Sequence, residues 1–139
     1  MKKILVGLLF IVLLLGGCST KITEENLNSI TNNMSQEEVE DILGKPDETS
    51  TNTEQLYTTL SHQYDSFSST HDDQDENSTE YSRMEVFLDN LNVLVDACYY
   101  NEKVEEFTYR YVDEDGEDSS NTIYFIDDKV FDLYTGLSN

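Results

Sequence analysis

Thiol chemistry is the first possibility, because the chain contains two cysteines, Cys18 and Cys98, and two histidines, His62 and His71. A nucleophilic thiol needs a histidine base beside it and a lowered pKa. Both histidines lie in or beside a very polar stretch that we expect to be a mobile loop. Free cysteines are among the most buried residues in proteins. We therefore predict that Cys98 is a buried structural residue and that the chain has no catalytic residue.

The acidic stretches suggest cation binding as a second kind of chemistry. A calcium loop of the EF type needs oxygen ligands at positions 1, 3 and 5, glycine at position 6 and glutamate at position 12. Counted from Asp113, Gly116 falls at position 4 and Tyr124 at position 12, so the template fails. Two histidines also supply too few ligands for zinc. We predict no metal site and no cofactor, and weak association with cations remains open.

The other cysteine follows a distinctive N-terminal segment. After two lysines, residues 4–17 form an unbroken apolar and glycine run that ends in Leu15-Gly16-Gly17, directly before Cys18. This pattern resembles the signal of bacterial lipoproteins, in which the thiol is alkylated with diacylglycerol and the chain is cut before it. A transmembrane anchor is the alternative, but the run is shorter than the ~20 residues that span a bilayer. We predict a signal peptide over 1–17 and lipidation at Cys18.

The lipid anchor would tether the rest of the chain to the bacterial cell membrane, with its domain facing outward. Two acyl chains hold a protein at a membrane essentially permanently. With Cys18 modified, Cys98 has no partner for an intramolecular disulfide, so the domain must be stable through its own core. We divide the chain into the signal peptide, a lipidated tether at 18–22 and a single domain over 23–139.

The charge of the chain restricts its partners. Asp and Glu number 29 and Lys and Arg number 8, which gives a formal net charge of −21. Binding to phosphate backbones requires a basic face, so we predict no nucleic-acid partner. A cationic partner, a cation or solubility alone are the remaining explanations of the acidity. The sequence has no glycine-rich phosphate loop, nucleophile elbow or metalloprotease helix, so a hydrolase acting through paired carboxylates is the least favoured class.

Two short helices are predicted at the start of the domain. Thr23 can cap the first helix, which should end near Asn32 and Asn33, since Asn tolerates left-handed backbone. Ser35 and Glu38 form a capping box for the second helix. Both helices are shorter than the ~12–15 residues needed for stability alone, so they must pack on another element.

The partner of these helices is predicted to be an antiparallel sheet, because the chain beyond Gln55 is rich in Tyr, Phe, Val and Thr. The alternation in Val104–Val112 and the short connections Asn101-Glu102-Lys103 and Asp127-Asp128 favour hairpins. The predicted fold class is therefore α+β. The expected strands are Gln55–Leu60, Arg83–Leu88, Val93–Tyr100, Val104–Val112, Asn121–Ile126 and Lys129–Tyr134.

Two acidic connections are predicted between these strands. Ser61–Glu80 is almost entirely polar and buries too little to offset its ordering entropy, so we expect a mobile acidic loop over 61–80. Asp113–Ser120 is a shorter connection of the same kind.

A motif over Leu27–Pro46 resembles the SmpA/OmlA (BamE-like) family of small lipoproteins, and most of all its uncharacterised Gram-positive relatives. The family pattern consists of separate short pieces in this order: two spaced apolar residues, Gly-Met-Ser/Thr, Glu-Val, Leu-Leu-Gly and a final Pro. Asn33 stands where the family usually has glycine. The resemblance implies two short helices on an antiparallel sheet, as in β-lactamase inhibitory protein, and a scaffold role without catalysis. The matching residues are Asn33, Met34, Ser35, Glu38, Val39, Leu43, Gly44 and Pro46.

The tyrosines are the best candidates for a contact surface, since Tyr is enriched at protein interfaces. We select Tyr109 and Tyr111 as a possible interaction face, and the alternative is ordinary packing within the sheet. Other tyrosines of interest are Tyr99, Tyr100, Tyr124 and Tyr134. The predicted function is a non-enzymatic interaction or scaffold module in the cell envelope, with an envelope protein as partner. The alternative is a module that binds or senses cations or cationic peptides through Ser66–Glu80 and Asp113–Ser120.

Overall fold

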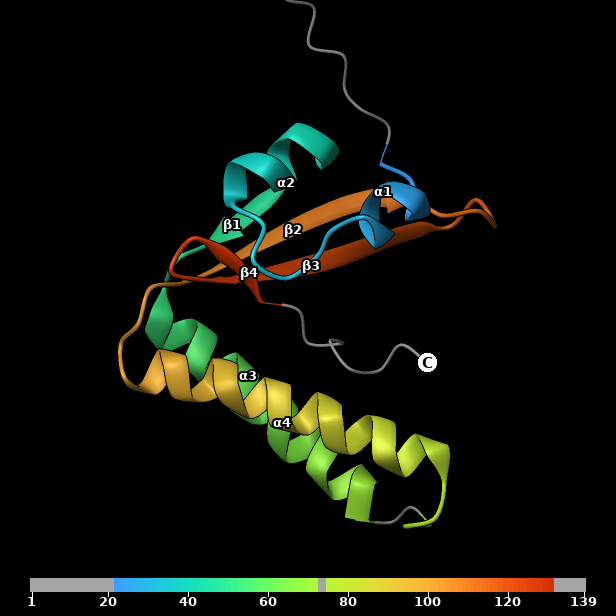
Figure 1. The fold of residues 1–139 in the computed structure, drawn as a ribbon, viewed down its shortest axis with the longest axis vertical. Helices are drawn as coiled ribbons and strands as arrows, with labels where there is room; N and C mark the ends of the chain where they lie inside the picture. The colour runs from blue at the N-terminus through green and yellow to red at the C-terminus, as the bar shows by residue number, and fades with distance from the viewer. Residues whose placement is uncertain (1–21, 73–74, 132–139) are drawn as a thin grey trace, which may run out of the picture.

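The fold is built around a four-stranded antiparallel sheet with the strand order β1-β2-β3-β4 (Figure 1). The computed structural model describes residues 22–72 and 75–131. These residues form a mixed helix and sheet structure, which confirms the predicted α+β class. The helices are α1 (Glu24–Asn28), α2 (Gln36–Leu43), α3 (Thr53–Asp72) and α4 (Thr79–Tyr99). The strands are β1 (Glu48–Ser50), β2 (Val104–Val112), β3 (Asp118–Ile126) and β4 (Lys129–Phe131).

Strands β2 and β3 pair in one unbroken register, from Val104 opposite Ile126 to Val112 opposite Asp118. Because side chains alternate between the two faces of a strand, this register separates two sets of core residues. One face of the sheet carries the buried residues that share a core with α1 and α2. The other face carries Val104 and Tyr124, which belong to the core of α3 and α4. The buried set on the first face is Phe107, Tyr109, Ile123, Phe125 and Val130.

Helices α1 and α2 both form and cover the first face, but α1 ends earlier than predicted, at Asn28 instead of near residues 32–33. The Thr23 hydroxyl accepts a hydrogen bond from the Asn26 amide, 3.2 Å away. Both bonds of the Ser35–Glu38 capping box are present. Asn33 has the left-handed backbone expected of it, with φ 68°. Val39 and Leu43 of α2 are buried in the sheet core, so the two short helices obtain from the sheet the stability that they lack alone.

Three of the predicted strands are wrong. Gln55–Leu60 lies in α3, and Arg83–Leu88 and Val93–Tyr100 lie in α4 and its C-cap. The reason is a helical spacing of apolar residues that outweighs the strand preference of the individual side chains. Leu56 and Leu60 in α3 face a similar row in α4 and form one buried cluster. The α4 members of this cluster are Phe87, Leu91, Leu94, Ala97 and Cys98.

The predicted mobile loop over 61–80 is also wrong in most of its length, because residues 61–72 continue α3 and α4 begins at Thr79. Ser78 caps α4 by accepting a hydrogen bond from the Tyr81 amide at 3.0 Å. The ordering entropy of this polar stretch is offset by packing against α4, including an edge-to-face contact between Phe67 and Phe87 with ring centres 5.1 Å apart.

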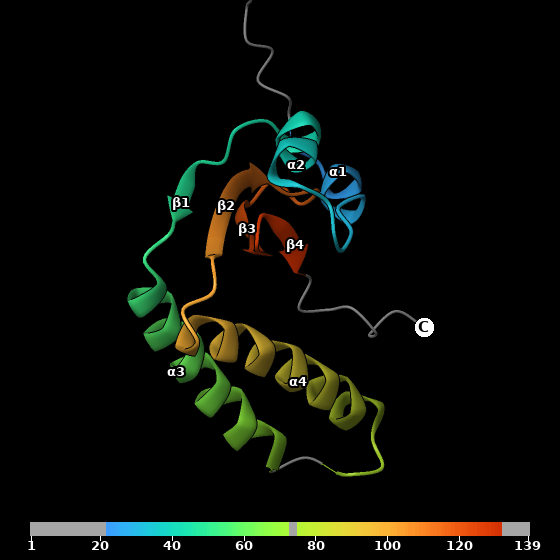
Figure 2. The same cartoon turned by 60° about the vertical axis from the view of Figure 1, so that its left-hand side comes forward.

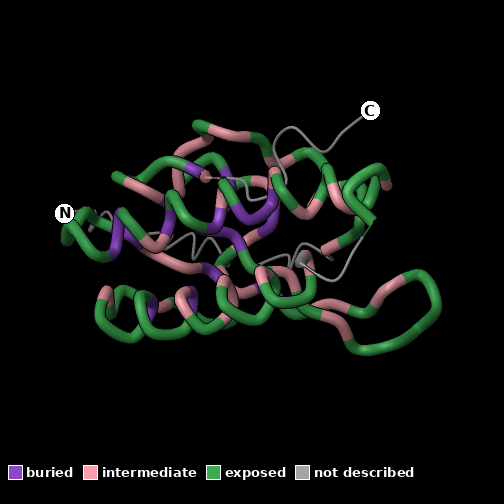
Figure 3. Tube along the Cα trace, turned by 90° about the horizontal axis from the view of Figure 1, so that it is seen from below, coloured by how far each residue is buried: buried purple, intermediate pink, exposed green. Residues whose placement is uncertain are grey.

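The α3–α4 pair forms a helical hairpin between β1 and β2, which are neighbours in the sheet (Figure 2). The two helices pack mainly on each other. The hairpin core includes Val104 and Tyr124 from the second face of the sheet. The sheet therefore has helices on both faces (Figure 2). Figure 3 shows how buried and exposed positions alternate along the chain.

The remaining turns refine the strand predictions. Asn101-Glu102-Lys103 joins a helix to a strand instead of closing a predicted hairpin. Asp127 and Asp128 form the tight turn before β4, with φ of 50° and 63°. Strand β3 begins at Asp118, within the predicted connection over 113–120. The described part of β4 ends at Phe131, and the rest of the predicted strand to Tyr134 lies outside the described residues.

Candidate protein-interaction surface

Tyr109 belongs to the core and not to a contact face. Its side chain is 0% exposed, and its hydroxyl donates a hydrogen bond to the Gly44 carbonyl oxygen at 3.2 Å. Burial raises the pKa of Tyr109 to about 12. The prediction of Tyr109 as part of an interaction face is therefore wrong, because the alternation of β2 turns it toward the α2 side. Tyr124 is buried as well, in the hairpin core.

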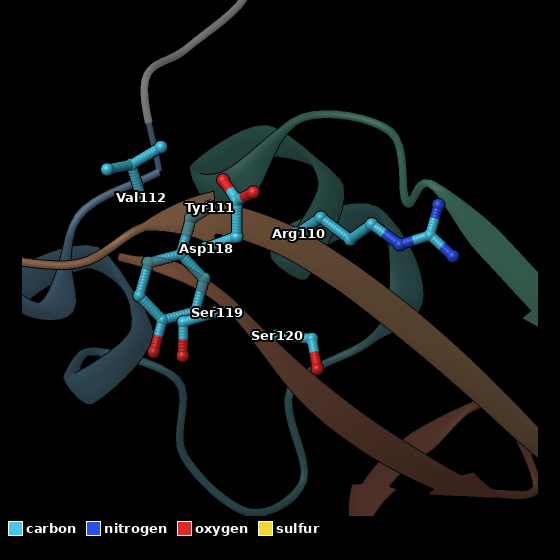
Figure 4. A pocket seen from close by; sticks show the side chains of 6 residues that line it. All are labelled: Arg110, Tyr111, Val112, Asp118, Ser119 and Ser120. Carbon is cyan, nitrogen blue, oxygen red and sulfur yellow. The ribbon is translucent and has the colours of Figure 1, made fainter. Parts of the chain in front are cut away.

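Tyr111 lies two residues further along β2, where the sheet extends beyond its helical cover. It is half-buried and lines a shallow hollow of about 510 Å³ at the end of β2 and β3. Figure 4 shows Tyr111 and Ser119, which are cross-strand partners, pointing to the same side, while Arg110 points away. The Arg110 guanidinium forms an ion pair with Glu48. Tyr111 thus remains accessible in part, but it stands apart from the other exposed tyrosines.

Three exposed tyrosines gather where the hairpin joins the sheet. Tyr57, Tyr99 and Tyr100 are 37%, 67% and 72% exposed. The ring centres of Tyr57 and Tyr99 are 6.1 Å apart, and those of Tyr99 and Tyr100 are 5.2 Å apart in an edge-to-face arrangement. These three residues form what we call the tyrosine patch. Such ring pairs stabilise their own geometry, so the patch presents a defined shape to solvent.

Local backbone structure holds the patch in place. Leu56 and Cys98 point into the hairpin core. Tyr57 and Tyr99 follow them by one residue, which turns them about 100° around the helix, and both side chains are exposed. At the end of α4 the Asn101 amide donates to the Cys98 carbonyl at 3.1 Å, and the Glu102 amide donates to the Ala97 carbonyl at 2.9 Å. Together with the positive φ of Asn101, 59°, this is a Schellman motif, which fixes the residues around a helix end.

Cys98 has the environment of a packing residue. Its thiol is free and buried, and burial raises its pKa to about 11. This is opposite to the lowered pKa of an activated thiol. His62 is exposed on α3, and His71 stacks on Tyr81 with ring centres 3.9 Å apart. The prediction that Cys98 is buried is confirmed, although it lies on a helix and not on a strand.

The acidic segments give no defined cation site. Within residues 22–72 and 75–131, no group of three or more His, Cys, Asp or Glu side chains is arranged to hold a metal ion. One Asp113 carboxylate oxygen accepts hydrogen bonds from the amides of Asp115 and Glu117, at 3.0 and 2.9 Å. This carboxylate is therefore used to shape its own turn. The segment Ser66–Glu80 is largely helical.

The motif residues shared with the SmpA/OmlA family all lie in α2 and its flanking turns. The Glu38 carboxylate accepts a hydrogen bond from the Ser35 amide at 2.7 Å, and this bond is the main cause of its lowered pKa. Gly44 ends α2 with φ 83°. These residues are structural, and membership of that family stays a prediction.

The predicted anchor residues Leu15, Gly16, Gly17 and Cys18 lie outside the described residues, as does Tyr134. In the part of the chain that the structure describes, no helix combines the length and apolar character needed to cross a membrane.

The sequence interpretation included Tyr99 and Tyr100 among its candidates but missed Tyr57. The available signal was the spacing of Leu56 and Leu60, which places Tyr57 beside a buried helical stripe. The fold and the patch together define a mixed α+β domain with an exposed aromatic surface. Comparisons with protein-family models, curated proteins and solved structures give no match to this chain.

Proposed function

We propose that this protein is an outward-facing, lipid-anchored module of the bacterial cell envelope that binds another protein through the tyrosine patch and catalyses no reaction. The observation that supports the proposal most directly is the exposure of Tyr57, Tyr99 and Tyr100 as one group of contacting rings. Tyrosines bury a large apolar area and lose few rotamers on binding, which makes them effective contact residues.

The rigidity of the patch supports the same proposal. Its residues project from two packed helices, and the Schellman motif fixes the end of α4. A preorganised surface loses less conformational freedom when a partner binds. The buried thiol of Cys98, with its raised pKa, offers no competing chemistry beside the patch.

The experiment is crosslinking in living cells of the tagged full-length protein, followed by mass spectrometry of the captured proteins. The test variant carries Tyr99→Ser and Tyr100→Ser, which remove exposed rings and leave the hairpin core in place. The control is Val112→Ser, because Val112 is an exposed apolar residue, 51% exposed, at the far end of β2. Circular dichroism checks that each variant is folded.

We expect an envelope protein to be captured by the native chain and by the Val112→Ser variant, and to be lost from the tyrosine double variant. Capture of the same proteins by all three would show that the patch is not the contact surface. Capture of nothing above background from the native chain would contradict the interaction role itself.

The anchor has its own test. Cys18→Ala removes the thiol that lipidation requires, so the variant should leave the membrane fraction and appear in the soluble fraction. The control is Cys98→Ala, which leaves Cys18 intact. A Cys18→Ala variant that still sediments with the membrane would contradict the lipid anchor.

A further inference from the structure

An exposed ridge of α4 leads directly to the tyrosine patch. Glu85, Asp89 and Asp96 are spaced by four and seven residues, which places them on one side of the helix. All three are exposed. Val93, which is 46% exposed, comes four residues after Asp89, and Tyr100 comes seven residues after Val93, so both lie on the same side of the helix as the acids. We call these five residues the α4 ridge.

The carboxylates of this ridge have no cationic neighbour among the described residues of the hairpin. Arg83 is the single Lys or Arg in α3 and α4. It lies two residues before Glu85, and residues two apart on a helix point in different directions. Within the described residues, 22–72 and 75–131, the ion pairs join Lys103 to Glu105 and Asp128, and Arg110 to Glu48. All of them lie at the sheet.

The ridge therefore combines unneutralised charge with exposed apolar surface. Glu85 and Asp89 are like charges one helical turn apart, which is unfavourable for an isolated helix. Charge of this kind disfavours a second copy of the chain as a close partner, since each copy carries a net charge of −21. The exposed Val93 and Tyr100 in line with the acids distinguish the ridge from a surface that serves solubility alone.

We propose that the α4 ridge and the adjoining tyrosine patch bind a basic polypeptide segment of a partner protein, with Lys or Arg side chains paired to Glu85, Asp89 and Asp96. Lys or Arg at the end of the segment would also contact the ring faces of Tyr99 and Tyr100, which attract cations. The ridge from residue 85 to residue 100 is about 22 Å long, which matches roughly fifteen residues of a helical segment. This inference rests on the proposed function and names the chemistry of its partner.

The test measures binding of a fluorescent peptide of about fifteen residues, with Lys and Leu at helical spacing, to the full-length protein in non-ionic detergent. Fluorescence anisotropy is followed at low and at physiological salt. The ridge variant carries Asp89→Asn and Asp96→Asn. The matched control carries Glu37→Gln and Asp41→Asn, which remove two exposed carboxylates from α2.

We expect the ridge variant to weaken binding about fivefold at low salt, as for the loss of two exposed ion pairs, and the α2 control to change it less than twofold. A further variant, Tyr100→Leu, keeps the apolar area but removes the ring. It should weaken binding by about two- to fivefold, the usual value of an exposed cation–π contact.

Equal weakening by the ridge variant and the α2 control would overturn the inference, since the peptide would then respond to total charge. No binding by the native chain at low salt would overturn it as well. The proposal of a basic segment can fail while the proposed interaction role stands. If crosslinking finds a partner that depends on Tyr99 and Tyr100, but Asp89→Asn and Asp96→Asn leave the capture of that partner unchanged, the basic segment is excluded and the interaction role stands.

Discussion

The two helical layers on either side of the sheet are stabilised in different ways. Helices α1 and α2 are short, begin with side-chain caps and bury their apolar residues against the sheet. Helices α3 and α4 are long, pack mainly on each other and add Val104 and Tyr124 of the sheet to their own core. The first layer depends on the sheet, whereas the hairpin carries most of its own core and is free to present its outer side to a partner.

The largest effect is expected in the core that α1 and α2 share with the sheet. Phe125 is fully buried, and its ring centre lies 4.6 Å from that of Phe107. Phe125→Ala should lower the free energy of unfolding by about 3–5 kcal/mol, because it removes buried apolar area and leaves a cavity. Urea denaturation followed by circular dichroism measures this, with Thr122→Ala at an exposed position of β3 as the control. A loss below about 1 kcal/mol would contradict the close packing of this layer.

A similar substitution in the hairpin should act on a smaller part of the molecule. Leu91 is fully buried in the hairpin core. Leu91→Ala should cost about 2–5 kcal/mol locally. Hydrogen exchange should show faster exchange in α3 and α4 than in the middle of β2 and β3, because the hairpin shares only part of its core with the sheet.

The control for this variant is Asn92→Ala, which changes an exposed neighbour on α4. If the amides of β2 and β3 accelerate as much as those of α3 and α4, the hairpin and the sheet open as one cooperative unit. The distinction between the two layers would then be wrong.

The same contrast explains how much of the fold the sequence predicts. The α1–α2 layer is specified by local signals, such as the Ser35–Glu38 box and the glycine at the end of α2, and these are read directly. The hairpin helices have side-chain caps as well, since Asn52 accepts a hydrogen bond from the Gln55 amide at 3.1 Å and Ser78 caps α4. The Ser, Thr and Tyr residues of the hairpin, however, have modest helix propensity. Its stability comes from contacts between Leu60 and the residues of α4, which a single sequence does not display.

Besides these caps, two other signals in the sequence favour the hairpin. No glycine or proline occurs between Pro46 and Gly116, although several hairpin turns in this span would favour such residues. Leu56 and Leu60 also repeat at the helical interval of four. The tyrosine patch was only partly predictable for the same reason, since the outward direction of Tyr57 and Tyr99 follows from the helices and not from the residue type.

A moderate effect is expected at the cap of α2. Ser35→Ala removes the hydroxyl that accepts a hydrogen bond from the Glu38 amide at 3.3 Å. The expected cost is about 1 kcal/mol, the usual value of an N-cap side chain. Thermal denaturation measures it, and Ser82→Ala at an exposed position of α4 is the control. Equal melting temperatures for Ser35→Ala and the native chain would show that the cap contributes nothing to the first layer.

The smallest effect is a pH dependence at the same cap. Hydrogen bonds from Ser35, first from its amide, lower the pKa of Glu38 from its ordinary value of 4.5. Because the folded pKa lies below the unfolded one, ionised Glu38 stabilises the fold above pH 4.5, and this contribution is lost as the pH falls through the lowered pKa.

The measurement compares melting temperatures of the native chain and Glu38→Gln across this pH range. The difference should be largest near neutral pH and should disappear at the acidic end. Glu114→Gln, in the turn between β2 and β3, serves as the control. A difference that stays constant with pH would show that the charge of Glu38 is not involved.

The position of the hairpin between β1 and β2 also has a kinetic consequence. These strands pair with each other although the whole of residues 51–103 separates them along the chain. Closing a flexible loop of that length would cost about 3.5 kcal/mol of chain entropy. The hairpin forms from contacts within its own segment and turns the chain back toward the sheet (Figure 2). During folding, α3 and α4 would therefore pack on each other first. This packing brings the two ends of the segment 51–103 close together, and β1 would pair with β2 only after that.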